Sequence, residues 1–450
     1  MKQAIDHLDQ SAGSVARRLT GKGITGQIAT LLALILTAAC VSLQGPDVDY
    51  GVRTARQLSE RGDHQSGVLL QEELDNLDAL MNYPRQTALL LPLTGRNRSK
   101  AEAIRNGFLA AHFGLQGLPT RPEISIYDTG RLPPAEAYRR AIENGADFIV
   151  GPLLKNSVTA VAAEAGQTTT LALNFLSNYR GTPRGFYQFA LSPEDEARQI
   201  AERAVAEGHS KAVALVADSD WGQRMLTSFA AELESRGGQL LDSAVFDVSS
   251  PDFASPIRRL LLLDESFARH ERLAANLGQK LQFEPRRRED VDFIFIAATA
   301  KNGIRIRPRL KYEGAGSIPT YATSNIFEVG STNNSDLDGI MFPDIPWLIQ
   351  PDPTARELQQ TLAQYWAGYL TDSRLYAMGY DMYRLMPFLN GEVRNVLAPV
   401  AGMTGQLYMD DNRRIHRRLT WARIERGQPQ PLPDLPTSLA DDIDTAMPEN

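Results

Sequence analysis

The sequence predicts an α/β protein built from two doubly wound lobes with a cleft between them. Its 450 residues exceed the roughly 250–300 residues at which a single hydrophobic core stops growing. Short apolar runs alternate with segments whose apolar residues recur at helical spacing, an order typical of parallel sheets. The alternation restarts near Ser192, and helices return after the second series. We therefore expect the chain to cross between the lobes more than once.

The first lobe begins near Gln86 with an uninterrupted apolar run, Thr87–Leu93. Such a run is expected of a strand that is buried on both faces of a parallel sheet. Ile104, Phe108 and Ala111 then follow at the spacing of one helix face. Further strands of this lobe are predicted at Glu123–Tyr127, Asp147–Val150 and Thr170–Leu173.

The second lobe opens on a helix start. Ser192 is a favourable N-cap residue, Pro193 suits the first helical position, and Glu194 places an acid in the first turn. An additional helix that includes Phe267 and Leu281 is predicted within this lobe. The strands are predicted at Lys211–Ala217, Leu240–Phe246, Val291–Ala297 and Thr320–Thr323.

The C-terminal part is predicted to hold two helices and then two strands. The helices lie at about Thr354–Tyr369 and Arg374–Leu389, and the strands, near Gly405–Met409 and Arg418–Ile424, flank a turn at Asp410. Lobe 1 would then comprise about 86–191 and 343–402, and lobe 2 about 192–342 and 403–427. Residues 428–450 are rich in proline and aspartate, so we expect a disordered tail there.

Composition and charge exclude several classes of protein. Hydrophobic residues make up 43% of the chain and charged residues 22%, which argues against whole-chain disorder, collagen and a multi-span membrane protein. The net charge of −7 argues against a non-specific nucleic-acid binder. The single cysteine, Cys40, can form neither an internal disulfide nor a thiolate metal site.

The first 39 residues are predicted to be a lipoprotein signal peptide. Arg17, Arg18 and Lys22 precede the uncharged apolar run Ile28–Ala39, which is shorter than the about 20 residues of a spanning helix. Small residues directly before Cys40 resemble the bacterial lipobox, in which the cysteine becomes an acylated N-terminus. The alternative is a buried apolar helix with an incidental thiol.

Multiple acyl chains on Cys40 would anchor the protein stably to a membrane. In similar lipoproteins an aspartate after the cysteine favours the inner membrane, and here Val41 favours the outer membrane. Residues 40–85 are predicted to be a tether and a short helical stub. Leu70, Leu74 and Leu77 share one face of that stub.

Ligands of open α/β sheets bind at the carboxyl ends of the strands, so the residues there form a candidate cleft. They are Thr94, Gly95, Gly151, Pro152, Asn174, Asp218 and Asp220, and the candidate cleft also includes Ser192 at the predicted helix start. Thr94, Asn174 and Ser192 could hydrogen-bond a ligand or serve equally as turn and cap residues. Asp218 and Asp220 could form an acidic pair beside Trp221, but we favour Asp220 as a helix cap.

Arg286, Arg287 and Arg288 form a candidate contact with a partner protein. The acids that follow, Glu289 and Asp290, allow a plainer interpretation, in which the loop pairs its own charges in solvent. We favour the second interpretation.

Several runs of the sequence, taken in order, resemble the penicillin-binding protein activator family of the LppC or LpoA type. They include LLLPLTGR (Leu89–Arg96), AIRNGFLAA (Ala103–Ala111), ADFIVGPLLK (Ala146–Lys155), LSPEDEARQ (Leu191–Gln199), FEPRRREDVDFIFIAA (Phe283–Ala298), LDGIMFPDIPWL (Leu337–Leu348) and TGQLYMD (Thr404–Asp410). The resemblance covers about Gln86 to Arg426.

This resemblance implies the type I periplasmic-binding-protein fold in an outer-membrane lipoprotein that faces the periplasm. That lipoprotein would stimulate a class A penicillin-binding protein, a bifunctional peptidoglycan synthase. Longer members carry a helical-repeat domain before this fold, where we expect only a short stub between Cys40 and Pro84.

The signatures of catalysis are missing from the sequence. It contains no Ser-x-x-Lys, no HExxH and no G-x-S-x-G motif, and its six histidines are scattered. We therefore expect no enzyme, no cofactor and no metal site. The first hypothesis is a regulator that acts by protein contact. The alternative is a solute-binding lipoprotein that holds a small polar ligand in the cleft and delivers it to a transporter.

Overall fold

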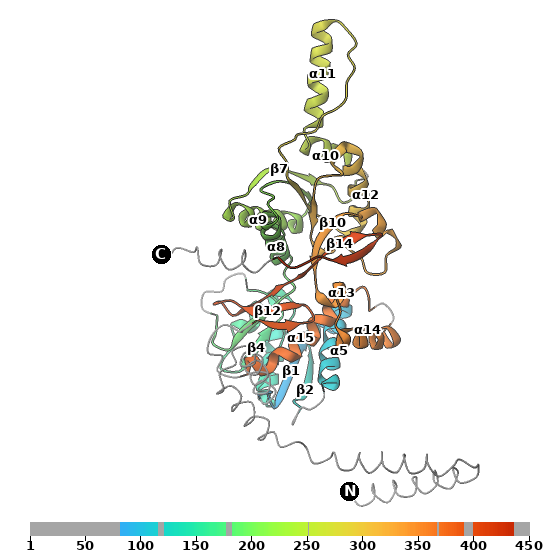
Figure 1. Ribbon diagram of the computed structural model, residues 1–450. Coiled ribbons are helices and arrows are strands. Elements are labelled where there is room, and N and C mark those ends of the chain that lie inside the picture. Colours follow the sequence, from blue (N-terminus) through green and yellow to red (C-terminus); the bar gives the residue numbers. More distant parts are fainter. Residues whose placement is uncertain are drawn as a thin grey trace, which may run out of the picture. The chain divides into compact units, whose positions relative to one another are not determined.

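The computed structural model describes residues 82–115, 121–176, 182–250, 252–366, 369–390 and 399–435 (Figure 1). Two mostly parallel sheets form two lobes, as predicted. The predicted signal peptide, Cys40 and nearly all of the helical stub lie outside the described residues.

Lobe 1 is built on an eight-stranded sheet in the order β11-β12-β13-β5-β4-β3-β1-β2. Its strands are β1 (Gln86–Leu91), β2 (Glu123–Asp128), β3 (Phe148–Val150), β4 (Thr169–Ala172), β5 (Phe186–Phe189), β11 (Val400–Gly402), β12 (Gly405–Met409) and β13 (Arg414–Arg418). Its helices are α5 (Arg98–Gly114), α6 (Pro134–Glu143), α7 (Lys155–Ala162), α13 (Pro346–Ile349), α14 (Pro353–Tyr365) and α15 (Ser373–Leu389).

Alternate residues of the strands face opposite layers of helices. Leu89 and Leu91 of β1 pack into the core that α5 and α15 cover. Ala88 and Leu90 of the same strand pack under α6 and α7. This two-sided burial is the physical reason that β1 is a continuous apolar run.

Lobe 2 is built on a seven-stranded sheet in the order β15-β14-β10-β9-β8-β6-β7. Its strands are β6 (Lys211–Ala217), β7 (Gln239–Phe246), β8 (Phe293–Ala297), β9 (Thr320–Ala322), β10 (Ile340–Asp344), β14 (Thr420–Glu425) and β15 (Gln428–Pro431). Its helices are α8 (Pro193–Ala206), α9 (Asp220–Ser235), α10 (Ala254–Leu260), α11 (Leu263–Leu277) and α12 (Ala300–Leu310), with short turns η1 (Lys311–Ala315), η2 (Ser324–Ile326) and η3 (Thr332–Leu337). Helices α8 and α9 cover one face of the sheet, and α10 and α12 cover the other.

The chain crosses between the lobes three times, and the last crossing corrects the predicted boundary. Residues from 403 were assigned to lobe 2, but β12 and β13 belong to the sheet of lobe 1. The reason is a long-range pairing, because β13 lies parallel to β5 while β14 lies antiparallel to β10. The crossing therefore falls at Leu419. The hairpin partner of β12 is Arg414–Arg418 rather than the predicted strand near Arg418–Ile424.

The predicted tail also begins too early. Gln428–Pro431 form the edge strand β15, which pairs with β14, so the prediction of disorder from residue 428 is wrong for these residues. Pro429 and Pro431 are tolerated because an edge strand has one row of backbone groups without a neighbour. Residues 436–450 lie outside the described residues.

Helices α5 and α15 pack backbone to backbone at the centre of lobe 1. A Cβ atom on Gly107 would overlap the backbone carbonyl group of Tyr376, and one on Gly379 would overlap that of Ile104. Glycine is therefore required at this crossing because no larger residue fits between the helices. Tyr383 of α15 packs edge-on against Phe108 of α5, with ring centroids 5.2 Å apart.

Candidate functional site

A cleft of about 620 Å³ lies where the two lobes meet. The crossing from β5 to α8 forms one wall, which includes Leu191 and Ser192. The other lining residues are Leu153, Lys155, Leu173, Asn174, Phe175, Ala190, Pro193, Glu194, Arg198, Arg224, Leu375, Met378 and Arg414. The cleft is thus assembled from segments that lie far apart in the sequence.

Two of the eight predicted cleft residues line this cleft, and both also have local structural roles. The Asn174 side-chain amide donates to the backbone carbonyl of Leu153 over 3.3 Å and accepts from the backbone N–H of Phe175 over 3.0 Å. The Ser192 hydroxyl accepts from the backbone N–H of Asp195 over 3.2 Å, as predicted for the N-cap of α8.

The other six predicted residues are not part of the cleft lining. Thr94 hydrogen-bonds with the carboxylate of Asp128, and Gly95 lies exposed in the turn after β1. Gly151 and Pro152 are buried at the end of β3. Asp218 and Asp220 follow β6 at the surface.

The N-cap of helix α9 is Ser219, the residue before the predicted Asp220. Ser219 accepts a hydrogen bond from the backbone N–H of Gly222 over 3.1 Å, so Ser219 rather than Asp220 is the N-cap. Asp220 is the first residue of the helix, and Trp221 packs partly buried against the core of lobe 2.

The cleft carries more positive than negative charge, but its arginines are engaged. The Nε atom of Arg224 lies 2.8 Å from Oε1 of Glu194, and Arg198 pairs with Asp195. Arg414 donates to the backbone carbonyl of Leu176 over 2.8 Å. Lys155, at the start of α7, and Arg414, on β13, were missed by the sequence analysis. Nothing in their local sequence indicates that the fold brings them together.

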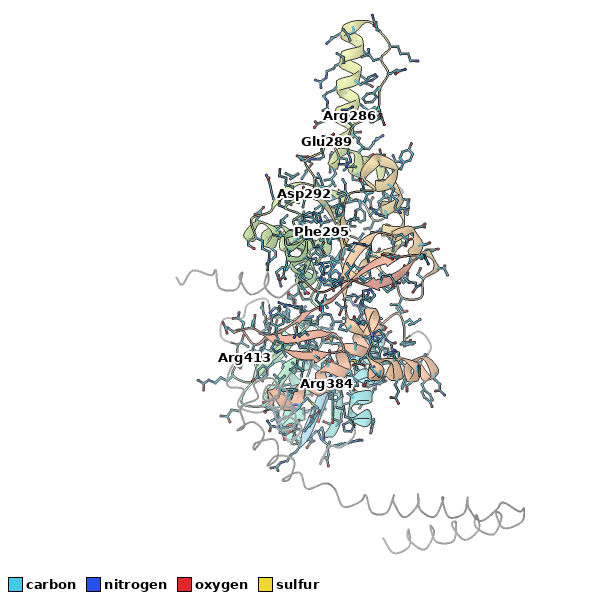
Figure 2. The ribbon with its side chains drawn as sticks, in the orientation of Figure 1. Arg286, Glu289, Asp292, Phe295, Arg384 and Arg413 are labelled. Atoms are coloured by element: carbon cyan, nitrogen blue, oxygen red, sulfur yellow. The ribbon has the colours of Figure 1, made fainter. Side chains whose placement is uncertain are left out.

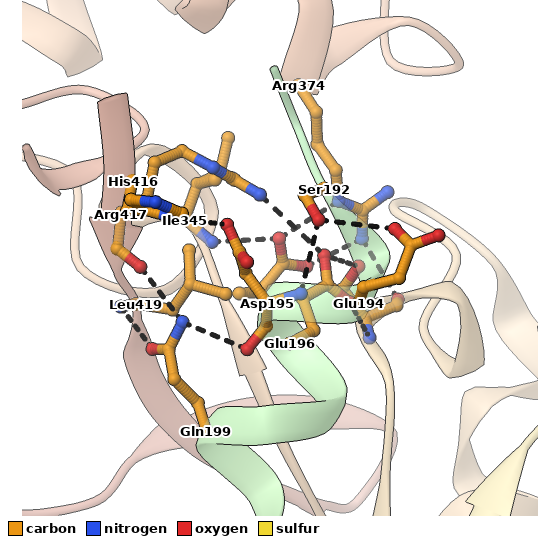
Figure 3. A network of polar contacts seen from close by, with 12 residues as sticks. Ser192, Glu194, Asp195, Glu196, Gln199, Ile345, Arg374, His416, Arg417 and Leu419 are labelled. Carbon is orange, nitrogen blue, oxygen red and sulfur yellow. Dashed lines mark hydrogen bonds and ion pairs between the residues drawn. The ribbon is translucent and has the colours of Figure 1, made fainter. Parts of the chain in front are cut away.

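A buried polar cluster joins the three crossings beside the cleft (Figure 3). We call it the hinge cluster. It consists of Asp195, Glu196, Asp344, Arg374, His416 and Arg417. Asp195 and Glu196 belong to the first crossing, Asp344 ends β10 at the second, and His416 and Arg417 precede the third.

His416 lies between two carboxylates. Its Nδ1 atom is 3.0 Å from Oδ2 of Asp195, and its Nε2 atom is 3.2 Å from Oδ2 of Asp410. Both ring nitrogens can donate only in the imidazolium form. Burial lowers the pKa of His416, but the hydrogen bonds and the charges of Asp195 and Asp410 outweigh it, so the pKa is raised overall.

Arg374 and Asp344 form a two-bonded ion pair within the cluster. Nη2 of Arg374 lies 2.6 Å from Oδ2 of Asp344, and Nε lies 2.9 Å from Oδ1. The same guanidinium donates to the backbone carbonyl of Ser324 over 3.1 Å. The Asp344 side chain is 1% exposed and that of Arg374 is 27% exposed, so this partly shielded pair holds α15 of lobe 1 against β10 of lobe 2.

Glu196 and Arg417 are the least well matched pair of the cluster. Glu196 accepts from the backbone N–H of Ser324 over 2.9 Å and from its hydroxyl over 3.0 Å. Nη2 of Arg417 is 4.0 Å from Oε1 of Glu196, and Nε and Nη2 of Arg417 have no hydrogen-bond partner among the described residues. Burial raises the pKa of Glu196 to about 7, against the attraction of Arg417.

The raised pKa of Glu196 predicts a pH dependence of stability. The ordinary pKa is 4.5, so the folded chain holds this proton more tightly than the unfolded chain. Its contribution to the free energy of unfolding is complete below pH 4.5 and is lost as the pH rises through about 7, a loss of about 3 kcal/mol. The raised pKa of His416 acts in the same direction.

Urea unfolding between about pH 5 and about pH 8 tests this expectation. The chain should lose stability across the range, and Glu196→Gln should lose clearly less. The control is Glu194→Gln, two residues earlier in the same helix, where the side chain is 29% exposed; this variant should keep the slope of the unsubstituted chain. Equal slopes for the chain and Glu196→Gln would contradict the assignment.

The three predicted arginines lie in the segment between α11 and β8. Figure 2 labels Arg286 in this segment. Arg288 makes a two-bonded pair with Asp290 over 2.7 and 2.9 Å. Arg287 donates to the backbone carbonyls of Gly314 and Arg288 over 3.0 and 2.9 Å. Arg286 is exposed. Two of the three are thus bound within the chain, and contact of Arg286, Arg287 and Arg288 with a partner stays a prediction.

The described residues hold no group of three or more histidine, cysteine, aspartate and glutamate side chains placed to bind a metal ion. In the same ranges, no helix is both long and apolar enough to cross a bilayer.

Comparison with known proteins identifies the family. Residues 54–427 match the family model described as LppC putative lipoprotein. The chain belongs to this LppC family. The resemblance that the sequence motifs indicated is therefore confirmed.

The curated relatives of this LppC protein are named penicillin-binding protein activator LpoA. That of Vibrio antiquarius is 31% identical over 386 residues, which cover 83% of this chain and 62% of the relative. That of Photobacterium profundum is 32% identical over 341 residues, which cover 74% of this chain and 55% of the relative. The chain thus spans about 55 to 62% of the length of these relatives.

Solved structures confirm the predicted fold of the LppC protein. The C-domain of LpoA (YraM) from Haemophilus influenzae, described as a regulator of PBP1A, aligns with a TM-score of 0.58 at 22% identity, covering 77% of this chain and 99% of that domain. A putative branched-chain amino acid ABC transporter protein from Rhodospirillum rubrum aligns with a TM-score of 0.60 at 16% identity, over 77% of this chain and 99% of the other. Both likenesses show the type I periplasmic-binding-protein fold alone.

Proposed function

We propose that this LppC lipoprotein activates a class A penicillin-binding protein and so promotes peptidoglycan synthesis. One observation carries the proposal. Relatives named penicillin-binding protein activator are 31 and 32% identical over 83 and 74% of this chain. The residues matched by the family model, 54–427, contain the cleft and nearly all of the two lobes described above.

The protein would act from the outer membrane, on its periplasmic face. The family description as a lipoprotein and the lipobox-like residues before Cys40 support an acyl anchor on this cysteine. Such an anchor holds the folded unit in the compartment where glycan strands are joined.

Activation by contact requires that the lipoprotein bind the active conformation of the synthase more tightly than the inactive one. Binding energy is lost when a flexible surface must be ordered, so a preorganised surface is more effective. The hinge cluster supplies this property, because Arg374 and Asp344 bond the lobes together through buried charges. We propose no chemical step on the lipoprotein itself.

The alternative, a solute-binding lipoprotein, is favoured by the cleft. Its size falls within the range of about 300–1,000 Å³ of small-molecule sites, and Lys155 would suit an anionic ligand. Three arginines of the lining are engaged with Glu194, Asp195 and the Leu176 carbonyl. A ligand would have to compete with these partners, and for this reason we place activation first.

A binding experiment separates the two functions. The full-length chain, kept in detergent, is immobilised and exposed to the purified class A synthase of the same cell and, as a control, to a class B synthase. We expect saturable binding of the class A protein alone. Absence of that binding, together with saturable binding of a small anionic metabolite, would favour the solute-binding function.

A further inference from the structure

A second, smaller cavity of about 290 Å³ lies on lobe 1 and shares no residue with the cleft. Its walls are the first half of α5 on one side and Trp366, Tyr369 and the start of α15 on the other. The lining residues are Ser99, Glu102, Arg105, Asn106, Trp366, Tyr369, Asp372 and Tyr376. Its volume is close to the lower end of the range of ligand pockets, so it has room for one small ring rather than a chain.

Aromatic rings dominate one side of this cavity. Trp366 is 41% exposed, although burial of such a large apolar surface would be favourable. Tyr365 lies beside it with ring centroids 6.1 Å apart and is 67% exposed. Deeper in, Tyr369 meets Tyr376 edge-on at 6.5 Å. Exposed tryptophan and tyrosine combine an apolar face with a polar edge, and that combination suits a ligand with the same two characters.

The polar groups of the cavity are held in fixed positions by hydrogen bonds. The Ser99 hydroxyl donates to Oδ2 of Asp372 over 2.5 Å. Arg105 donates from Nε and Nη2 to Oδ1 of Asn106 over 3.1 and 2.9 Å, and Asn106 also hydrogen-bonds with Tyr376. These bonds preorganise the side chains. Within the described part of the chain, the second oxygen of Asp372 and the Nη1 donor of Arg105 have no hydrogen-bond partner, so both can bond with a ligand.

The balance of these groups points to hydroxyl and amide partners rather than to an ion. One guanidinium faces two carboxylates, Glu102 and Asp372, and Glu102 is also paired with Arg98 over 2.8 Å. Neither an anion nor a metal cation would find a matching excess of charge. A pyranose ring, by contrast, presents an apolar C–H face to aromatic rings and hydroxyl groups around its edge.

We propose that this pocket binds a sugar ring of a glycan that carries acylamino groups. The sugar stacks on Trp366, and its amide and hydroxyl groups bond with Arg105, Asn106 and Asp372. This inference rests on the proposed function, since the glycan within reach would be the strand that the synthase makes. The pocket would then hold the activator on the product while the rest of its surface contacts the enzyme.

The test measures binding of a chitin trisaccharide to the full-length chain, without any synthase and in a detergent that has no sugar headgroup. Isothermal titration should give saturable binding. Trp366→Ala should weaken it by roughly tenfold or more, as loss of one aromatic contact implies. Arg105→Gln should weaken it as well. Tyr312→Ala is the matched control, because Tyr312 is an exposed aromatic residue, 79% accessible, on lobe 2.

Each outcome decides the proposal. Saturable binding that Trp366→Ala weakens and Tyr312→Ala leaves unchanged supports the pocket. No saturable binding, or equal affinity in Trp366→Ala, overturns it, and equal affinity for a glucose trisaccharide overturns the amide assignment. If Trp366→Ala weakens binding of the synthase while the chain binds no sugar, the pocket is a protein contact and the glycan site is wrong. Because the sugar titration contains no synthase, a negative titration does not count against the proposed activation of the synthase.

Discussion

Gly107→Ala should unfold lobe 1 or cost at least about 3 kcal/mol of its free energy of unfolding. The new methyl group would overlap the backbone carbonyl of Tyr376, and a backbone atom of a packed helix cannot move aside as a flexible side chain can. Alanine is the better helix former by about 1 kcal/mol, so helix propensity alone predicts the opposite sign. Urea denaturation followed by circular dichroism measures the change.

Gly114→Ala provides the matched control for this substitution. Gly114 ends the same helix, α5, and a Cβ atom there would meet nothing within 4 Å. The control should therefore be neutral or slightly stabilising. If Gly107→Ala were as stable as Gly114→Ala, the close crossing of α5 and α15 would be wrong.

Arg374→Ala should lower the free energy of unfolding by about 3 kcal/mol, because removal of one partner of a buried ion pair leaves the other charge uncompensated. Asp344 would remain at 1% exposure without its two-bonded partner, close to Glu196. The carbonyls of Ser324 and Phe327 would lose a donor at the same time. Chemical denaturation measures the loss, and hydrogen exchange should show faster opening around η2 and α8.

Two variants sharpen this second prediction. Arg98→Ala breaks an exposed pair with Glu102 on α5 and should leave the stability essentially unchanged. Arg374→Met combined with Asp344→Asn removes both charges and should recover part of the loss. A loss for Arg374→Ala no greater than that for Arg98→Ala would show that the pair does not stabilise the hinge.

The sequence predicted those parts of the fold that depend on neighbouring residues. The apolar run Thr87–Leu93 contains most of β1, and the cap and proline at Ser192 and Pro193 mark the start of α8. Both signals arise within a few residues, from burial on two faces and from the unsatisfied groups of a helix end.

The parts that could not be predicted depend on long-range pairing. Strand β13 returns to the sheet of lobe 1 because it lies beside β5, more than two hundred residues earlier in the chain. The same applies to the cleft, where Arg414 arrives on β13, and to the hinge cluster, where Asp195 meets His416. A charged residue in an isolated segment resembles a solvated one, so no local signal indicates that it will be buried opposite a partner.

The residues of the cleft likewise include some that local sequence predicted and others that it did not. Asn174 was found because it directly follows a predicted strand, and Ser192 because it caps a predicted helix. Thr94 and Asp218 also follow strands, but they lie outside the cleft lining. The rule that ligands bind at the carboxyl ends of strands selects an edge of the sheet and not the residues along it.

The rate of peptidoglycan synthesis tests the central proposal most directly. The full-length chain in detergent is mixed with the purified class A synthase of the same cell and lipid-linked precursor, and glycan polymerisation and cross-linking are followed over time. We predict a saturable increase in at least one rate that the Gly107→Ala variant fails to produce. Unchanged polymerisation and cross-linking at every concentration of the folded chain would contradict the proposed function.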